Sequence, residues 1–250
     1  MTKEKIRVEN LTIAYGQNVI MHDVNFTVNT KDIFMVMGGS GCGKSSLLKT
    51  LIGLKQPQTG KVFIHDKNFY NSSEKERKKI MQNCGILYQN GALFSSMTIG
   101  ENIAMPLQQY SKYSQQTIKE LVELKLALVG LHGYHDFYPD ELSGGMKKRA
   151  ALARAIALDP DILYFDEPSS GLDPVSSRLL DELIAELNAN LGITIVIISH
   201  DIDSILTIGQ QAIYLDADVK TLTAQGNPKE WFRNPPNQAI AEFFRRRTEN

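Results

Sequence analysis

The sequence predicts an α/β fold with a mostly parallel sheet, an antiparallel β part at the N-terminus and an inserted helical part. Three short apolar segments, each followed by a helical pattern, are typical of buried parallel strands joined by crossover helices. Alternating apolar and polar residues near the N-terminus are typical of half-buried antiparallel strands. A chain of 250 residues can bury one sizeable core and a smaller lobe, so we expect a single domain.

The N-terminal elements follow from two patterns. Ile6 to Ile13 and Met21 to Val28 alternate apolar and polar side chains, which predicts the antiparallel strands. Ile33 to Met37 is continuously apolar and ends at glycines, after which apolar residues recur at helical spacing from Leu47 to Ile52. This segment is therefore predicted to be a buried strand, a glycine loop and a helix.

The later strands repeat the buried pattern. Ile162 to Phe165 and Ile193 to Ile198 are both apolar, and a helical pattern follows the second of them from about Asp201. The basic C-terminal triplet, Arg245 to Arg247, is expected to be solvated.

The middle of the chain predicts helices and no strand. Helical periodicity runs from Ile118 to Leu128, and an alanine-rich stretch follows from Ala150 to Ala157. We interpret residues 91–158 as a helical subdomain, inserted between residues 1–90 and 159–250, which form the α/β core with its antiparallel β part.

Charge and cysteine usage exclude several classes of function. The formal net charge is -1, so no overall positive field favours nucleic acid, and no nucleic-acid partner is expected. Cys42 and Cys84 have neither zinc-site nor disulfide-framework spacing, which indicates a reducing compartment. No apolar stretch resembles a signal peptide or approaches the roughly 20 residues of a membrane span. We expect a cytoplasmic protein.

Residues 38–45 fit the pattern G-x-x-x-x-G-K-[ST] and lie between the predicted strand and helix. In that setting the backbone N–H groups can surround phosphate oxygens, and the Lys44 ammonium can neutralise the outer phosphates. The Ser45 hydroxyl can bind Mg²⁺. A glycine-rich turn without a ligand is the alternative, but the context favours a P-loop NTPase core. The candidate ATP-binding residues here are Gly38, Gly39, Ser40, Gly41, Cys42, Gly43, Lys44, Ser45 and Ser46.

A second element supports nucleotide hydrolysis. Asp166 and Glu167 follow a buried strand, at the sheet edge where open α/β folds bind ligands. Side chains alternate along a strand, so the two acids can have different roles. We predict that Asp166 holds Mg²⁺ and that Glu167 acts as general base toward the attacking water. Two solvated acids at a strand end are the alternative, which a preceding phosphate loop disfavours.

Further motifs, in a fixed order, resemble the nucleotide-binding subunits of ATP-binding cassette (ABC) transporters over nearly the whole chain. They are Tyr15, Gln89, Leu142 to Met146, Ser169 to Asp173, and His200. The resemblance implies that Tyr15 stacks on adenine and that Gln89 contacts magnesium and acts in catalysis. It also implies that His200 is the switch histidine of the catalytic site.

The resemblance further implies a homodimer. Ser143, Gly144 and Gly145 open a helix, so they form a second backbone site for phosphate, which one chain does not need for one γ-phosphate. In the family, this signature segment of one subunit closes over ATP held by the other. By the same resemblance Asp173 lies at the interface.

Two stretches look like the Mla-type ATPases, which energise phospholipid transport together with MCE-domain proteins. They are Tyr88 to Thr98 and Leu142 to Pro160, where Met146 replaces the usual glutamine. This implies an integral membrane permease docked on Gly91 to Phe94, an MCE-domain lipid-binding protein and a small STAS-domain subunit as partners. The chain would then lie on the cytoplasmic face of the bacterial inner membrane. An apolar loop packed on the chain's own helical subdomain is the alternative for Gly91 to Phe94.

The predicted function is therefore an ATPase that drives phospholipid transport between inner and outer membranes and maintains outer-membrane lipid asymmetry. Two alternatives share the catalytic residues. One is the ATPase of an amino-acid or metal-chelate importer. The other is a soluble ABC protein of DNA repair or translation, which the near-neutral charge and single cassette disfavour.

Overall fold

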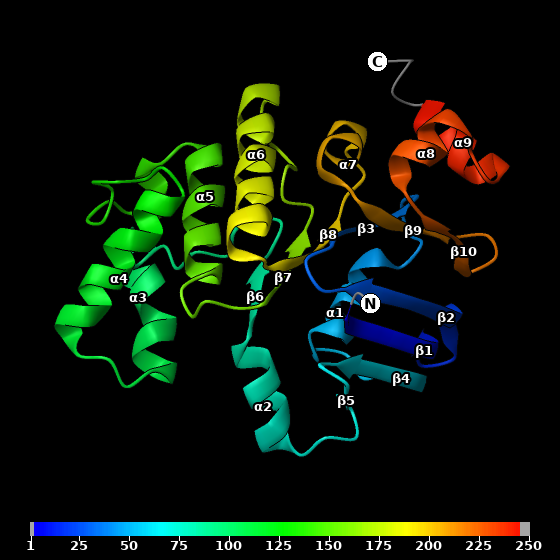
Figure 1. The fold of residues 1–250 in the computed structure, drawn as a ribbon, viewed down its shortest axis with the longest axis horizontal. Helices are drawn as coiled ribbons and strands as arrows, with labels where there is room; N and C mark the ends of the chain where they lie inside the picture. Colours follow the sequence, from blue (N-terminus) through cyan, green and yellow to red (C-terminus); the bar gives the residue numbers. More distant parts are fainter. Residues whose placement is uncertain (1–2, 246–250) are drawn as a thin grey trace.

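A computed structural model of the chain describes residues 3–245, so Arg246 and Arg247 of the predicted basic tail lie outside the described residues. Its centre is a six-stranded sheet in the order β10-β9-β3-β8-β7-β6 (Figure 1). The five strands from β9 to β6 pair in parallel, and β10 pairs antiparallel with β9. The predicted, mostly parallel sheet is confirmed. The strands are β3 (Ile33–Gly38), β6 (Cys84–Leu87), β7 (Ile162–Asp166), β8 (Thr194–Ile198), β9 (Gln211–Asp216) and β10 (Thr221–Gly226).

The antiparallel β part is a separate four-stranded sheet in the order β2-β1-β4-β5. Its long strands β1 and β2 pair antiparallel, as their alternating sequence predicts. The sequence pattern did not reveal β4, because its first three residues are exposed and only its end is buried. The strands are β1 (Glu4–Tyr15), β2 (Asn18–Asn29), β4 (Thr59–Ile64) and β5 (Lys67–Asn68).

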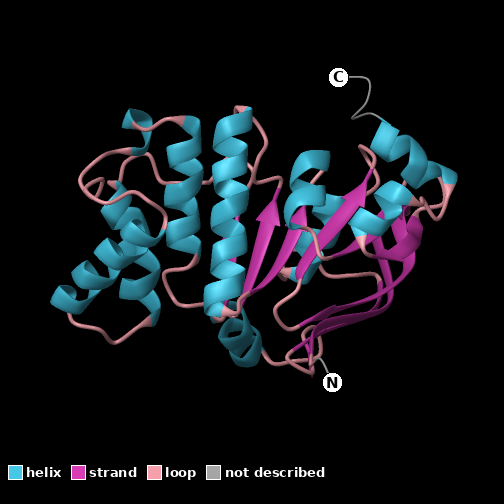
Figure 2. Cartoon of the chain, turned by 45° about the horizontal axis from the view of Figure 1, so that its top comes forward, coloured by secondary structure: helices cyan, strands magenta, loops and turns pink. Residues whose placement is uncertain are grey.

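The six-stranded sheet separates two hydrophobic cores, because successive side chains of a strand point to opposite faces. Phe34 and Val36 pack with α1 (Lys44–Leu51) and the antiparallel sheet. Met35 and Met37 pack on the other face, which the remaining core helices cover (Figure 2). Those helices are α6 (Pro174–Leu191), α7 (Ile202–Ile208), α8 (Pro228–Arg233) and α9 (Gln238–Arg245).

The helical part lies at one end of the sheet, shown in green in Figure 1. It contains α3 (Ile99–Tyr110), α4 (Gln115–Leu128), η1 (Pro139–Glu141) and α5 (Gly144–Ala155). Helix α2 (Glu74–Gln82) precedes β6. All residues between 91 and 158 are helical or loop, in keeping with the predicted insertion, whose boundaries stay a prediction. Within residues 3–245, no helix combines the length and apolar character needed to cross a bilayer.

Candidate functional site

The phosphate loop connects the fully buried strand β3 to helix α1. Gly38 must be glycine, because a Cβ there would lie 2.4 Å from the Leu215 carbonyl oxygen. Gly43 precedes α1 with φ of 98°, a left-handed conformation that favours glycine, and a Cβ would collide with Ile20 and Met21. The two glycines let the loop curl tightly between strand and helix.

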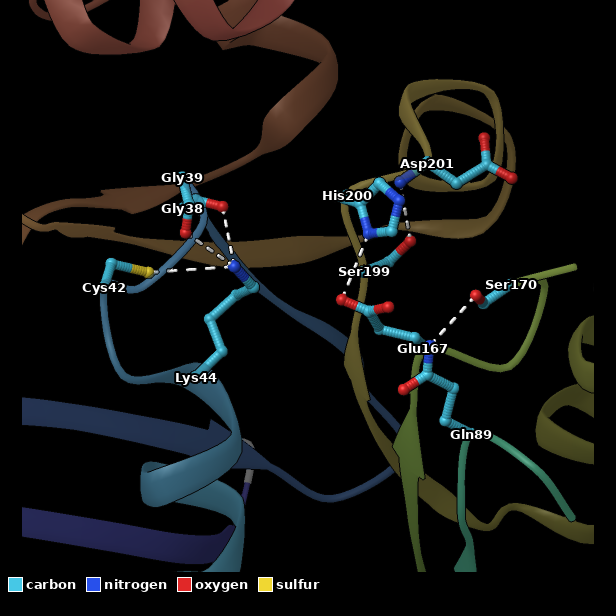
Figure 3. A network of polar contacts seen from close by, with 10 residues as sticks. All are labelled: Gly38, Gly39, Cys42, Lys44, Gln89, Glu167, Ser170, Ser199, His200 and Asp201. Atoms are coloured by element: carbon cyan, nitrogen blue, oxygen red, sulfur yellow. Dashed lines mark hydrogen bonds and ion pairs between the residues drawn. The ribbon is translucent and has the colours of Figure 1, made fainter.

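The Lys44 side chain turns back into this loop. Its Nζ donates hydrogen bonds to the carbonyl oxygens of Gly38 and Gly39, each at 2.8 Å, and the residue is 8% exposed (Figure 3). The ammonium is thus fixed at the centre of the loop. A phosphate bound there would meet both this charge and the N-terminus of α1.

The cysteine of the loop faces inward. Cys42 is 2% exposed, and burial raises the pKa of its thiol despite the nearby Lys44 ammonium. The second cysteine, Cys84 in β6, also has a pKa raised by burial, to about 12. In the loop, the Cys42 thiol is therefore buried and held in its protonated form.

A cavity of about 1120 Å³ opens over the phosphate loop. The phosphate loop, Glu167 and His200 all line it, and the two side chains follow neighbouring strands. The structure therefore brings together most of the predicted ATP-site residues. Of the predicted residues, Gly38, Gly39, Ser40, Gly41, Gly43, Lys44, Ser45, Ser46, Glu167 and His200 line the cavity. Tyr15, Cys42, Gln89, Ser143, Gly144, Gly145, Asp166 and Asp173 are outside its lining.

The two acids diverge at the end of β7. The Glu167 backbone has φ of 48° and its N–H donates to the Ile198 carbonyl oxygen at 2.9 Å, which directs the side chain toward His200. Glu167 Oε1 lies 3.1 Å from His200 Nδ1. Burial, and then the charge of Glu167, raise the pKa of Asp166, while the ammonium groups of Lys49, Lys44 and Lys148 oppose the shift. The site therefore concentrates negative charge beside the phosphate loop.

Gln89 lies two residues beyond β6 and approaches the acids from the next strand. Its Nε2 donates to Ser170 Oγ at 3.1 Å (Figure 3). The Gln89 carbonyl accepts a hydrogen bond from Lys148 of α5. Gln89 thus bridges the core loop after β7 and the helical subdomain.

Tyr15 ends β1 and is 49% exposed. The Lys55 ammonium lies 3.8 Å from the centre of its ring, and the Tyr15 hydroxyl is 3.5 Å from Ser46 Oγ. The ring therefore stands beside the phosphate-loop helix, which is compatible with the predicted stacking on adenine.

Ser143, Gly144 and Gly145 lie next to the Asp173 loop. The Ser143 hydroxyl caps α5 by accepting from the Met146 N–H, and a Cβ on Gly145 would lie 3.0 Å from Ser176 Oγ. Asp173 caps α6, and its hydrogen bonds with Ser176 lower the pKa of its carboxyl group. These segments adjoin one another, but not the chain's own phosphate cavity.

The donor set suits Mg²⁺. The cation prefers hard oxygen ligands and binds few protein groups, and the predicted ligands are the Ser45 hydroxyl, the Asp166 carboxylate and the Gln89 amide. A divalent cation would also offset the adjacent charges of Asp166 and Glu167. No cluster of three His, Cys, Asp or Glu residues that could hold a metal by itself occurs within residues 3–245.

Sequence reasoning missed several residues of the site. Ile20, Phe243 and the segment Asp201 to Asp203 also line the cavity, and Lys55 contacts Tyr15. Phe243 comes from the C-terminal helix, which no local motif connects to the phosphate loop. Lys148 carried a usable signal: it precedes the buried Leu152 by one helical turn, so it faces inward.

With this geometry in place, comparison with known proteins identifies the family. The family model described as ABC transporter matches residues 21–170. The chain belongs to the ABC transporter family. This confirms the predicted class of enzyme, an ATPase of the ABC type, and the resemblance on which the site residues were proposed.

Two groups of relatives are similar along most of the chain. The intermembrane phospholipid transport system ATP-binding protein MlaF of Haemophilus influenzae is 39% identical over 230 residues, which is 92% of this chain and 86% of that protein. MlaF of Escherichia coli is 37% identical over 230 residues, with 92% and 85% covered. The probable ribonucleotide transport ATP-binding protein mkl of Mycobacterium tuberculosis is 44% identical over 203 residues, 81% of this chain. The match spans only 56% of the mycobacterial protein.

Solved structures confirm the fold. CbiO1 of Clostridium perfringens, part of the ABC transporter complex cbiONQ, superposes with a TM-score of 0.85 at 28% identity and covers 93% of this chain and 92% of that one. The ATP-binding cassette MJ0796, described as a dimer bound to ADP and Pi after hydrolysis, gives a TM-score of 0.80 at 28% identity and covers 89% and 98%.

Proposed function

We propose that this chain is the ATP-hydrolysing subunit of a transporter that moves phospholipid between the inner and outer membranes through a separate permease. The observation that carries the proposal is the match to MlaF, which extends over 92% of this chain and at least 85% of each relative. Maintenance of outer-membrane lipid asymmetry follows as its role. The chain would sit on the cytoplasmic face of the inner membrane.

In the proposed reaction, the phosphate loop and Lys44 hold the β- and γ-phosphates, and Glu167 accepts a proton from the attacking water at its carboxylate. Mg²⁺, when bound, would neutralise charge that develops on the phosphate oxygens. Ser45, Asp166 and Gln89 would hold it. His200 Nδ1 is 3.1 Å from Glu167 Oε1, so the imidazole can orient that carboxylate.

The proposed active form is a homodimer. Ser143 and Gly144 are exposed at the N-terminus of α5 and do not line the chain's own cavity. A second copy in head-to-tail orientation would bring this helix N-terminus to the γ-phosphate, with Asp173 beside it. The description of MJ0796 as a dimer with ADP and Pi supports this arrangement.

A groove beside the Gln89 loop is our candidate docking site for the permease. A cavity of about 550 Å³ lies among α2, β6, α3 and α5 and includes Met81, Ile86 and Met105. Arg154 lines it and also binds the carbonyl oxygens of Gly91 and Ala92. Phe94 is 47% exposed. A short permease helix bound here would press on the loop that carries Gln89.

The relative mkl supports a second candidate cargo, because its name assigns ribonucleotide transport and its identity is higher over a shorter stretch. We favour phospholipid because the MlaF relatives match over nearly their whole length. An MCE-domain protein and a small STAS-domain subunit are the further partners that this proposal implies.

Two experiments test the proposal. Purification of the intact complex in mild detergent should recover a permease, an MCE-domain chain and bound phospholipid, whereas recovery of a nucleotide cargo without phospholipid would contradict the proposed substrate. In the purified chain, Glu167→Gln should keep ATP binding within about two-fold, lower the hydrolysis rate about 100-fold and accumulate as an ATP-bound dimer. Normal turnover in this variant would exclude Glu167 as the base.

A further inference from the structure

Helix α5 holds the backbone of the Gln89 loop from one side. Lys148 Nζ donates to the Gln89 carbonyl oxygen. Further along the same helix, Arg154 donates to the Gly91 and Ala92 carbonyl oxygens at 2.9 and 2.7 Å. The loop therefore follows α5, the helix that Ser143 caps.

Helix α3 holds the rest of the same loop. Asn102 is fully buried, accepts from the Phe94 N–H and donates to the carbonyl oxygens of Phe94, Met97 and Thr98. By contrast, the Gln89 side chain contacts neither helix in these bonds and donates instead to Ser170 in the core loop after β7. Gln89 is thus the point where the loop, fixed to the helical subdomain, meets the catalytic acids.

Lys148 is the buried cation of this junction. The residue is 6% exposed although the ordinary position of a lysine is at the surface. Burial lowers the pKa of its ammonium, and the charges of Glu167 and Asp166 oppose that shift. Burying an ammonium group costs free energy unless the group is paired. The hydrogen bond to the Gln89 carbonyl and the nearby charges of Glu167 and Asp166 offset that cost for Lys148.

We infer that Lys148 is a positioning residue, which through its hydrogen bond to the Gln89 carbonyl holds the Gln89 side chain at the ATP site. It also ties the position of Gln89 to α5, the helix that Ser143 caps. If a permease helix bound in the groove displaced α5, Gln89 and the signature segment would then move together. This inference rests on the proposed role of Gln89 toward Mg²⁺, and it assigns to one lysine the link between that role and the signature segment.

The test compares Lys148→Met with Lys148→Arg in the full chain. Methionine fills similar space without a donor, so hydrogen exchange of the Gly91 amide, which bonds to the Tyr88 carbonyl oxygen across the turn that contains Gln89, should become about five-fold faster without nucleotide. At saturating ATP, kcat should fall about ten-fold and half-saturation by Mg²⁺ should rise about five-fold, with KM for ATP within about two-fold. Arginine retains donors and should restore most of both properties.

Lys147→Met is the matched control, because Lys147 is partly exposed and forms a loose ion pair with Asp140 at 3.7 Å. It should change neither exchange nor Mg²⁺ dependence. Unchanged loop exchange in Lys148→Met would overturn the inference, as would faster exchange throughout α3 to α5 with a raised KM, which marks a purely structural lysine. Absence of hydrolysis by the unmodified chain would instead contradict the proposed function, while loop exchange would still decide the role of Lys148.

Discussion

Two helix N-termini in this chain can offer backbone N–H groups to phosphate, and their surroundings differ. Helix α1 has no side-chain cap, and the 8% exposed Lys44 stands beside it in a large cavity. Helix α5 is capped by its own Ser143, which is exposed and outside that cavity. The first site therefore has a cavity within one chain, which the second copy would complete, whereas Ser143 lies outside that cavity. The difference is what the proposed homodimer explains.

The largest expected effect is at the first site. Lys44→Ala removes the charge that the loop holds at its centre, so the Kd for ATP should rise about 100-fold or more in isothermal titration calorimetry. An unaltered melting temperature would show that the fold persists. ATP affinity equal to that of the unmodified chain would mean that the α1 site does not hold the phosphates.

The second site should respond in the opposite manner. Gly144→Asp places a carboxylate at the N-terminus of α5, and a Cβ there meets Leu172 at 3.7 Å, an ordinary contact. ATP affinity should stay within about two-fold, while hydrolysis falls about 100-fold, because the new charge repels the γ-phosphate of the partner. Gly144→Ala is the neutral control and should keep most activity. If Gly144→Asp lowered ATP affinity and hydrolysis by the same factor, the proposal that the α5 site acts only on the partner's ATP would be contradicted.

The smallest effect concerns the packing that joins the two regions. Asp181 of α6 accepts a hydrogen bond from Ser204 of α7 at 2.6 Å. Burial raises the pKa of Asp181 to about 6; the hydrogen bond from Ser204 lowers this pKa, and the nearby acidic side chains raise it further. The folded chain then binds a proton more tightly than the unfolded chain. Asp181 thus contributes stability below its unfolded pKa, which is lost as pH rises through about 6.

Asp181→Asn keeps an acceptor for Ser204 and removes the buried charge. We expect the free energy of unfolding to increase by about 1 to 2 kcal/mol at about pH 8 and to change little at about pH 4. Urea denaturation at the two pH values measures this difference. A stabilisation that does not depend on pH would show that the carboxyl group ionises normally in the folded chain.

Much of the fold could be predicted because its signals are local. The buried strands β3, β7 and β8 are continuous apolar segments, and the paired strands β1 and β2 alternate. Strand β6 escaped detection because Cys84 to Leu87 is only four residues long and includes a glycine. The parallel strand β9 lies beyond the last motif, and its place in the sheet is known from its pairing with β3 and β10 in the structure.

The residues of the site also fall into those that a local pattern predicts and those that it does not. Lys44 and the loop glycines belong to one contiguous pattern, so the sequence alone predicts their proximity. The contact between Lys148 and Gln89 joins residues 59 positions apart, and Phe243 reaches the cavity from the C-terminal helix. Such contacts depend on how the helices pack, which no short pattern encodes.

The burial of the native thiols has a practical consequence. Because the thiolate is the reactive form, Cys42 and Cys84, whose pKa values are both raised by burial, should react slowly with maleimides near neutral pH. A single cysteine introduced at Leu124 of α4, which is 52% exposed and is none of the proposed ATP-site residues, would then be labelled selectively in the otherwise native sequence. A fluorophore attached there could follow movement of the helical subdomain in real time without first mutating the phosphate loop.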